Sequence, residues 1–260
     1  MDAEKVFLDY AGRYDRTNGK IELKIVHTLA VAEVMDRLTE ALGLSERMRE
    51  LAHGCAVFHD IGRFEQVKRY DTFLDHLSVD HAALGCAVLE EEGILKELGE
   101  RERRMVLTAV GNHNRFRIEE GLDEETLLLC RLIRDADKCD IFRVFACEDM
   151  VDTMGETVEQ VEKETVSDVV LEGILRHQSI RKEVRRTGLD KWVSFLGFVF
   201  DLNFVESMRI LRVERYYRRP FERADFREPE TRRRVARILE EIEQYMDARL
   251  GQIPAYQTVK

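Results

Sequence analysis

The chain has 260 residues and a formal net charge of −10, which argues against general adhesion to nucleic acid or to anionic lipid. Its three prolines and 15 glycines leave long stretches without helix breakers, and this composition predicts an all-α fold. The five cysteines include no C-x-x-C pair and the first residues, MDAEKVFLDY, show no secretory signal, so we expect reduced thiols and a cytoplasmic protein.

Apolar side chains recur at three- and four-residue spacing along most of the chain, which is the pattern of amphipathic helices. In chain order, the first predicted helix covers residues 21–42. Ser45 is expected to cap a second helix, which stops near Gly62 and leaves His59 and Asp60 at its C-terminal end. Burying this carboxylate costs several kcal/mol unless it is paired or bound to a metal.

Three further predicted helices carry polar residues at or near their ends. The third is expected to have Ser78 as its cap and His81 in its first turn. The fourth ends at His113, and Asp123 is expected to cap a long apolar helix that contains Asp137. Each of these helices therefore brings a side chain that can bind metal.

The C-terminal part of the chain also has a helical pattern. Its most apolar segment, residues 192–205, is shorter than the ~20 residues that a membrane helix needs. We expect this segment to form a buried core helix and a candidate interface of a homo-oligomer. Residues 231–250 are predicted to form a last amphipathic helix, with Pro229 near its start. The expected organisation is a single all-α domain over residues 1–260.

Positive charge gathers between Arg209 and Arg237, where eleven arginines meet five acids and the segment carries +6. One interpretation is an anion-binding face whose aromatic side chains stack on bases. The aromatic residues concerned are Tyr216, Tyr217, Phe221 and Phe226. We favour the other interpretation, in which the arginines pair with acids elsewhere in the chain. Nucleic acid is therefore not an expected partner.

Metal-competent side chains occur on five of the predicted helices. A lone histidine on an apolar helix is more often a core residue than a ligand. A helical bundle, however, can direct residues from facing helices at one interior point, and metal sites are built in this way. The candidate metal ligands are His27, His59, Asp60, His81, His113 and Asp137.

The order of these residues resembles the HD superfamily of metal-dependent phosphohydrolases, in which a His, a His-Asp pair and an Asp follow one another along an all-α domain. Here they are His27, His59-Asp60 in HDIGR and Asp137 in RDADKCD. The histidines of SVDHAALG and GNHN occupy the place of the two extra histidines in members that hold two metals. The resemblance, which is to an uncharacterised bacterial branch, covers about residues 20–145 and leaves about residues 146–260 as a C-terminal helical extension.

Departures from other branches of this superfamily narrow the expected activity. HDIGRF replaces the HDxxED of the guanosine-tetraphosphate hydrolases, and the Gly-Tyr-Pro tripeptide of the cyclic-dinucleotide phosphodiesterases does not occur. Arg63 stands where some single-metal nucleotidases have a Glu. The first difference disfavours guanosine-tetraphosphate hydrolysis, and the resemblance leaves the substrate open.

The ligand set indicates which cofactors to expect. Mixed imidazole and carboxylate ligands suit one or two divalent ions of Fe, Mn, Co, Ni or Zn better than Mg, which prefers oxygen and is a weaker candidate. A bridging Asp60 is expected to hold two cations about 3.5–4 Å apart, with a water acidified to a pKa of about 7. Arg63 is the first candidate, and Lys138 the second, for binding charge that develops on a phosphoester. The predicted catalytic residues are Asp60, Arg63 and Lys138.

The predicted function is a phosphomonoesterase or phosphodiesterase that acts on a nucleotide or another small phosphoester through a metal-activated water. One alternative is a di-iron oxygenase, because some members of the superfamily use the same residues to hold iron and activate dioxygen. Another is a metal-stabilised, non-catalytic regulatory module in which the basic segment contacts a partner. The expected partner is a small phosphorylated substrate, with no membrane association.

Overall fold

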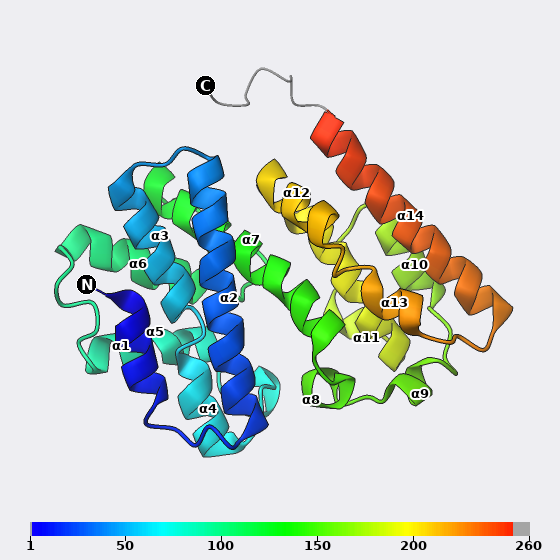
Figure 1. Ribbon diagram of the computed structural model, residues 1–260, viewed down its shortest axis with the longest axis horizontal. Coiled ribbons are helices and arrows are strands. Elements are labelled where there is room, and N and C mark those ends of the chain that lie inside the picture. Colours follow the sequence, from blue (N-terminus) through cyan, green and yellow to red (C-terminus); the bar gives the residue numbers. More distant parts are fainter. Residues whose placement is uncertain (1, 252–260) are drawn as a thin grey trace. The chain divides into compact units, whose positions relative to one another are not determined.

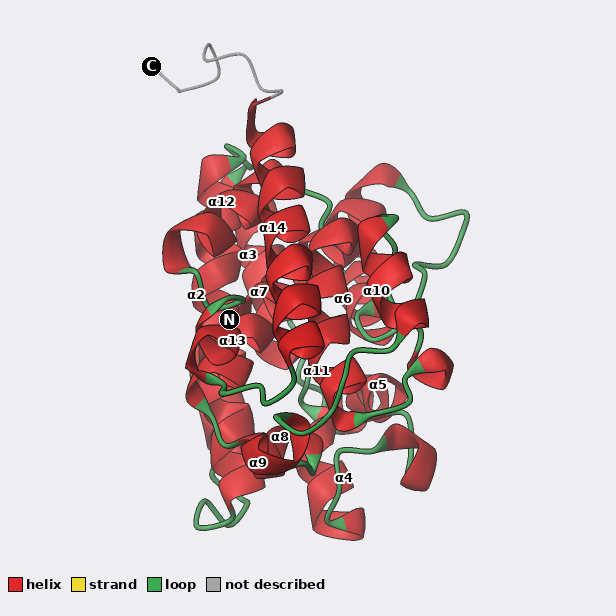
Figure 2. Cartoon of the chain, turned by 90° about the vertical axis from the view of Figure 1, so that its right-hand side faces the viewer, coloured by secondary structure: helices red, strands yellow, loops and turns green. Residues whose placement is uncertain are grey.

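The computed structural model describes residues 2–251, and within this range it contains helices and loops but no strand. Figure 2 shows this all-α architecture, which confirms the predicted fold class. No helix in the same range is both long and apolar enough to cross a membrane. The chain divides into two compact units, Met1–Asp140 and Ile141–Lys260, which are described separately. The expected single domain stays a prediction, and residues 252–260 of its C-terminal extension lie outside the described range.

Unit 1 is a bundle in which α2 packs on α3, α3 on α6, α4 on α5, and α5 on α6 (Figure 1). Its helices are α1 (Ala3–Ala11), α2 (Gly19–Ala41), α3 (Glu46–Phe58), α4 (Gly62–Tyr70), the 3₁₀ helix η1 (Asp75–Leu77), α5 (His81–Glu91), α6 (Glu100–Asn112) and the first part of α7 (Glu124–Cys147). The predicted helix over residues 21–42, the helix that Ser45 was expected to cap and the helix ending at His113 are thereby confirmed. Helix α4 was not predicted.

Local capping signals begin several helices of unit 1. Ser45 Oγ accepts a hydrogen bond from the Met48 backbone at 3.3 Å, and so caps α3 as predicted. Asp123 likewise accepts from the Thr126 backbone at 3.2 Å before α7. The prediction of Ser78 as the cap of α5 is wrong, because Asp80 directly precedes that helix.

Asp80 Oδ1 accepts from the backbone N–H groups of Ala82 at 2.9 Å and Ala83 at 3.3 Å. Ser78 lies too far before the helix for this role. Its hydroxyl instead accepts from Gln66 Nε2 and donates to the Leu74 carbonyl, both at 2.9 Å.

The prediction that Gly62 stops the second helix is also wrong, because Gly62 begins α4. His59, which follows α3, keeps right-handed helical dihedral angles of φ −56° and ψ −40°, so no left-handed glycine is needed there. A Cβ atom on Gly62 would lie 2.3 Å from the His81 carbonyl oxygen and 2.5 Å from the Gly85 nitrogen. The glycine therefore allows the backbones of α4 and α5 to touch.

Unit 2 contains the end of α7 and a series of shorter helices that precede one long helix. They are α8 (Met150–Met154), α9 (Val158–Val161), α10 (Asp168–Leu175), the 3₁₀ helix η2 (Lys182–Val184), α11 (Gly188–Ser194), the 3₁₀ helix η3 (Phe195–Asp201), α12 (Val205–Glu214), α13 (Arg219–Arg223) and α14 (Pro229–Gly251). Helix α14 confirms the predicted last helix and its proline start.

The prediction of one helix over residues 192–205 is wrong. The segment consists of the last turn of α11, then η3, and then an extended stretch before α12. Its aromatic and β-branched residues, together with Gly197, Asp201 and Asn203, have low helix propensity. Burial is as expected, since the side chains of Trp192 and Val199 lie in the core.

The arginines of the basic segment pair largely with acids. Arg212 Nε lies 2.9 Å from Asp247 Oδ1, Arg218 Nη1 lies 2.7 Å from Glu243 Oε1, and Arg234 Nη1 lies 2.6 Å from Asp168 Oδ1. Three of the four aromatic residues proposed for base stacking are buried in the core, which removes them from any such face. These are Tyr217, Phe221 and Phe226.

Candidate metal centre

All six predicted ligands meet at one point inside unit 1. One residue lies within α2 and one within α7. A His-Asp pair lies at the junction between α3 and α4, one residue begins α5, and one directly follows α6. In the same order they are His27, Asp137, His59-Asp60, His81 and His113. The four histidines and Asp60 are buried, so the helices deliver their polar groups to the interior.

Asp60 occupies the middle of the centre and faces two pairs of histidines. Its Oδ2 lies 3.5 Å from His59 Nε2 and 3.7 Å from His27 Nε2. Its Oδ1 lies 3.5 Å from His81 Nε2 and 3.6 Å from His113 Nε2. Each pair with Asp60 forms a buried group whose ligand atoms lie within 4.8 Å of one another. One carboxylate is thus shared by two candidate metal sites.

Asp137 joins one of these two groups. Its Oδ1 lies 3.1 Å from His27 Nε2 and 3.8 Å from His59 Nε2. The first group therefore has two histidines and two carboxylates, while the second has two histidines and the shared carboxylate of Asp60.

Backbone carbonyls fix the tautomers of two histidines. His59 Nδ1 donates to the Ala56 carbonyl and His113 Nδ1 donates to the Val110 carbonyl, each at 2.7 Å. Because a carbonyl can only accept, both Nδ1 atoms must carry hydrogen. The Nε2 lone pairs of both rings therefore point to the centre, which is the arrangement of a metal-binding histidine.

Carboxylates play the same part for the other two histidines. His27 Nδ1 donates to Asp140 Oδ2 and His81 Nδ1 donates to Asp75 Oδ2, each at 2.7 Å. Sequence reasoning missed both acids. Asp140 carried a signal, since it follows Asp137 by three residues on the same face of α7, whereas Asp75 begins the short 3₁₀ helix η1, where the sequence has no periodic pattern.

The residues present fit a bound cation. His59 Nε2 is buried and makes no hydrogen bond among the described residues. His81 Nε2 and His113 Nε2 lie 3.0 Å apart, although the hydrogen of each ring is already placed on Nδ1. Two lone pairs at this distance repel unless a proton or a metal ion lies between them, so the donor set suits a divalent transition metal.

The sequence model of the HD domain family matches residues 25–141, a range that contains all six candidate ligands. Over these residues the chain is similar to the HD domain. Neither the curated proteins nor the solved structures compared with the chain gave a match. The match confirms the resemblance seen in the sequence, and the HD domain coincides closely with unit 1.

Charges inside the HD domain set the ionisation of its centre. Burial alone raises the pKa of Asp60, but the charge of Lys24 and the histidine neighbours outweigh it and hold this pKa well below its usual range. Burial also raises the pKa of Asp137, but its contacts with His27, His59 and His113 outweigh burial and hold this pKa below its usual range. Burial lowers the pKa of His81 to about 4. At neutral pH the two carboxylates are charged and His81 is neutral, as metal binding requires.

Arg63 lies in the first turn of α4, beside the centre. Its Nε is buried 3.5 Å from Asp60 Oδ1 and makes no hydrogen bond among the described residues. Its Nη1 donates to Gln66 Oε1 at 2.7 Å, to the Phe73 carbonyl at 2.7 Å and to Asp75 Oδ1 at 3.0 Å. These contacts fix the guanidinium, while its role toward a substrate stays a prediction.

Two lysines differ in how they relate to the centre. Lys138 is buried in α7 directly after Asp137. Its catalytic role stays a prediction. Lys24, which sequence reasoning missed, donates from Nζ to Asp60 Oδ2 at 2.6 Å. It precedes His27 by three residues on the same face of α2.

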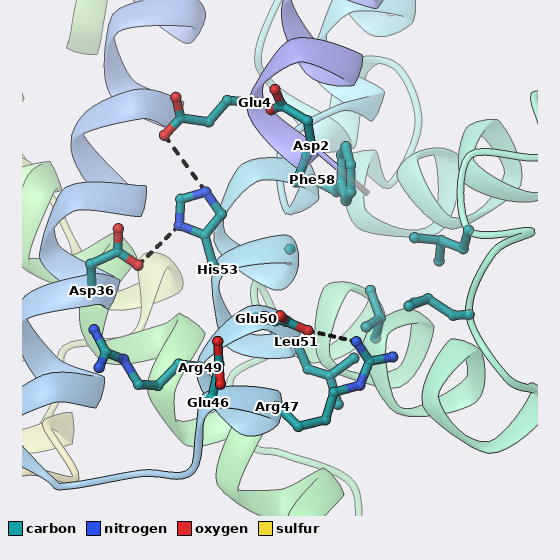
Figure 3. A pocket seen from close by; sticks show the side chains of 15 residues that line it. Asp2, Glu4, Asp36, Glu46, Arg47, Arg49, Glu50, Leu51, His53 and Phe58 are labelled. Atoms are coloured by element: carbon teal, nitrogen blue, oxygen red, sulfur yellow. Dashed lines mark hydrogen bonds and ion pairs between the residues drawn. The ribbon is translucent and has the colours of Figure 1, made fainter.

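A separate pocket of about 760 Å³ lies between α1, α2, α3 and the region around α6, and none of the six ligands lines it. Figure 3 shows His53 inside this pocket with Asp36 on one side and Glu4 on the other. His53 Nδ1 lies 2.9 Å from Asp36 Oδ1, and Nε2 lies 3.6 Å from Glu4 Oε1. The hydrogen bond with Asp36 raises the pKa of His53. This histidine therefore belongs to an ion-pair cluster and not to the metal centre.

Proposed function

We propose that the HD domain is a metal-dependent phosphohydrolase that acts on a nucleotide or another small phosphoester in the cytoplasm. The position of Asp60 carries this proposal. Its two carboxylate oxygens face separate histidine pairs at 3.5–3.7 Å, so Asp60 and these histidines would hold two metal ions. Two-metal sites of this kind are typical of phosphatases and nucleases.

The residues of the centre have distinct tasks in this proposal. When bound, a divalent metal lowers the pKa of water to about 7 and so provides a nucleophile at neutral pH. The histidines keep their Nε2 lone pairs directed inward because their Nδ1 atoms are engaged by carbonyl and carboxylate groups. Arg63 presents a fixed cation beside Asp60, where it can bind the charge that develops on a phosphoryl oxygen. The ligand chemistry favours Fe, Mn, Co, Ni or Zn over Mg.

Substitution of the carboxylates tests the proposal. Asp60→Asn and Asp137→Ala should abolish hydrolysis of a panel of phosphoesters and lower metal content, while helical content remains close to that of the wild type. They remove charge that the metal needs and little core volume. Asp71→Asn is the matched control, because this exposed carboxylate pairs with Lys20 away from the centre. Activity would be followed by phosphate release, metal by elemental analysis and helix by circular dichroism.

The outcomes separate the candidate functions. Full hydrolytic activity in either carboxylate variant would rule out the proposed mechanism. A wild-type protein that holds two iron ions, consumes dioxygen and hydrolyses no phosphoester would instead favour the di-iron oxygenase. Bound metal with neither activity would favour the regulatory module.

A further inference from the structure

We infer that Lys24 is a substrate-binding residue which, together with Arg63, clamps the terminal phosphate of a phosphomonoester beside the metal centre. This inference rests on the proposed function and extends it by choosing the monoester over the diester. The ammonium of Lys24 donates to Asp60 Oδ2 at 2.6 Å, while Arg63 Nε lies 3.5 Å from Asp60 Oδ1. Two fixed cations therefore flank the carboxylate shared by the two ligand groups.

The placement of Lys24 needs a reason beyond metal binding. Its side chain is 16% exposed, and ordering and burying a lysine carries a cost in solvation and in side-chain entropy. An ammonium beside the ligands of a divalent cation also meets like charge, and Asp60 compensates this charge only in part because the candidate metal sites share the same carboxylate. A bound phosphate supplies further negative charge, since each of its oxygens can accept from an ammonium.

Phe73 holds both cations from the loop that follows α4. Lys24 Nζ lies 5.3 Å from the centre of the Phe73 ring, and Arg63 Cζ lies 5.5 Å from it. Both distances are within the range of cation–π attraction. The backbone carbonyl of Phe73 also accepts from Arg63 Nη1 at 2.7 Å. One loop residue thus sets the positions of a lysine from α2 and an arginine from α4.

The charge of this pair favours a phosphomonoester. A terminal phosphate carries about −1.5 to −2 at neutral pH, whereas a phosphodiester carries a single negative charge. The monoester also has three free oxygens. They can contact Lys24, Arg63 and the part of the site that faces the metal ligands at the same time. Two side-chain cations in addition to bound metal therefore match a dianion better than a monoanion.

Binding of two small probes by the metal-loaded full chain tests the inference. Inorganic phosphate represents the dianion and dimethyl phosphate represents the monoanionic diester, with affinities measured by calorimetry. The wild type should bind inorganic phosphate more tightly. Lys24→Met, which removes charge and keeps chain length, should weaken that binding about 10- to 100-fold, the usual range for losing a charge-assisted hydrogen bond. Lys24→Arg should restore part of the affinity.

Lys20→Met is the control, because Lys20 lies one turn earlier on α2 and pairs with Asp71 at 2.6 Å instead of Asp60. It removes the same charge and should change phosphate affinity by less than about twofold. Elemental analysis should find the wild-type metal content in Lys24→Met and in Lys20→Met.

Three results would overturn the inference. They are phosphate binding in Lys24→Met that equals that of Lys20→Met, loss of metal from Lys24→Met, and equal or tighter wild-type binding of dimethyl phosphate. Each can occur while the wild type still hydrolyses phosphoesters, in which case the proposed function stands and the role of Lys24 does not. A wild type that neither binds phosphate nor hydrolyses any ester would contradict both.

Discussion

A carboxylate in the middle of a protein core is costly unless other charges compensate it. Asp60 is 3% exposed, and Lys24 and four histidines surround it, so its burial is explained by the centre and not by packing. The same contacts explain why His59 follows an apolar run directly. An imidazole whose Nδ1 is held by the Ala56 carbonyl can offer its other nitrogen to a metal without losing a backbone partner.

The number of metal ions that the chain binds should depend on single residues of the centre. We expect two metal ions per chain, with His81→Ala or His113→Ala losing about one equivalent and most of the activity. The other ion should remain, because His27, His59 and Asp137 form a group with Asp60 that does not need the second histidine pair. Elemental analysis normalised to protein concentration measures the loss.

His53→Ala is the control for this measurement, since His53 lies in the ion-pair cluster of a different pocket. It should keep both equivalents. One equivalent in the wild type and in both centre variants would show that His81 and His113 are not ligands.

The convergence of the six candidate ligands could be predicted from the sequence, whereas several of their partners could not. The chain has only seven histidines, so the order of four of them with Asp60 and Asp137 along the chain is informative. Lys24, Asp75 and Asp140 are charged residues of a kind that occurs throughout the sequence, and only the folded chain shows that they contact Asp60, His81 and His27. The local sequence pattern does not show which charged residues will contact each other in the folded chain.

Helix boundaries show the same division between local and distant information. Ser45 and Asp123 could be identified as caps because the cap bonds a backbone N–H three residues away. Gly62 was misread because a glycine after a helix usually stops it, and the contact that requires a glycine here lies in α5, about twenty residues further on. A glycine that serves packing between helices has no local signature.

Gly62→Ala tests the close contact between the backbones of α4 and α5. The new Cβ would meet backbone atoms of α5 at 2.3 and 2.5 Å, so α4 and α5 must separate. We expect a loss of at least about 1–3 kcal/mol in the free energy of unfolding. Because His81 begins α5, metal content should fall as well. Urea unfolding followed by circular dichroism measures the first effect and elemental analysis the second.

Gly54→Ala is the matched control, since Gly54 lies inside α3 and a Cβ there would meet nothing within 4 Å. It should raise the free energy of unfolding by about 0.5–1 kcal/mol, because alanine loses less backbone entropy in a helix. Equal stability of the two variants would contradict a close backbone contact at Gly62.

At the scale of the whole molecule, charge is distributed unevenly along the chain. The segment from Arg209 to Arg237 carries +6 in a chain of net charge −10. Within unit 2, Glu243 Oε1 accepts from Arg218 Nη1 at 2.7 Å and from the Tyr217 hydroxyl at 2.8 Å, and it lies 3.3 Å from Arg212 Nη1. One acid thus engages two arginines and a buried tyrosine. The positive segment is compensated largely where it lies.

This pairing leads to the prediction that the wild-type chain does not bind nucleic acid at physiological salt. Non-specific binding by nucleic-acid-binding proteins has a Kd of about 10⁻⁴–10⁻⁶ M under such conditions, and we expect weaker binding than that to both single-stranded and duplex probes. Glu243→Gln removes one acid that Arg212 and Arg218 share, while Asp247 and Glu222 still pair with them, and it should increase retention in a gel-shift experiment at low salt. Asp71→Asn changes the net charge equally from a position in unit 1, so it controls for charge alone. Tight wild-type binding that falls steeply with salt would contradict the pairing argument and favour the regulatory module, because a basic face able to release counterions would then be exposed.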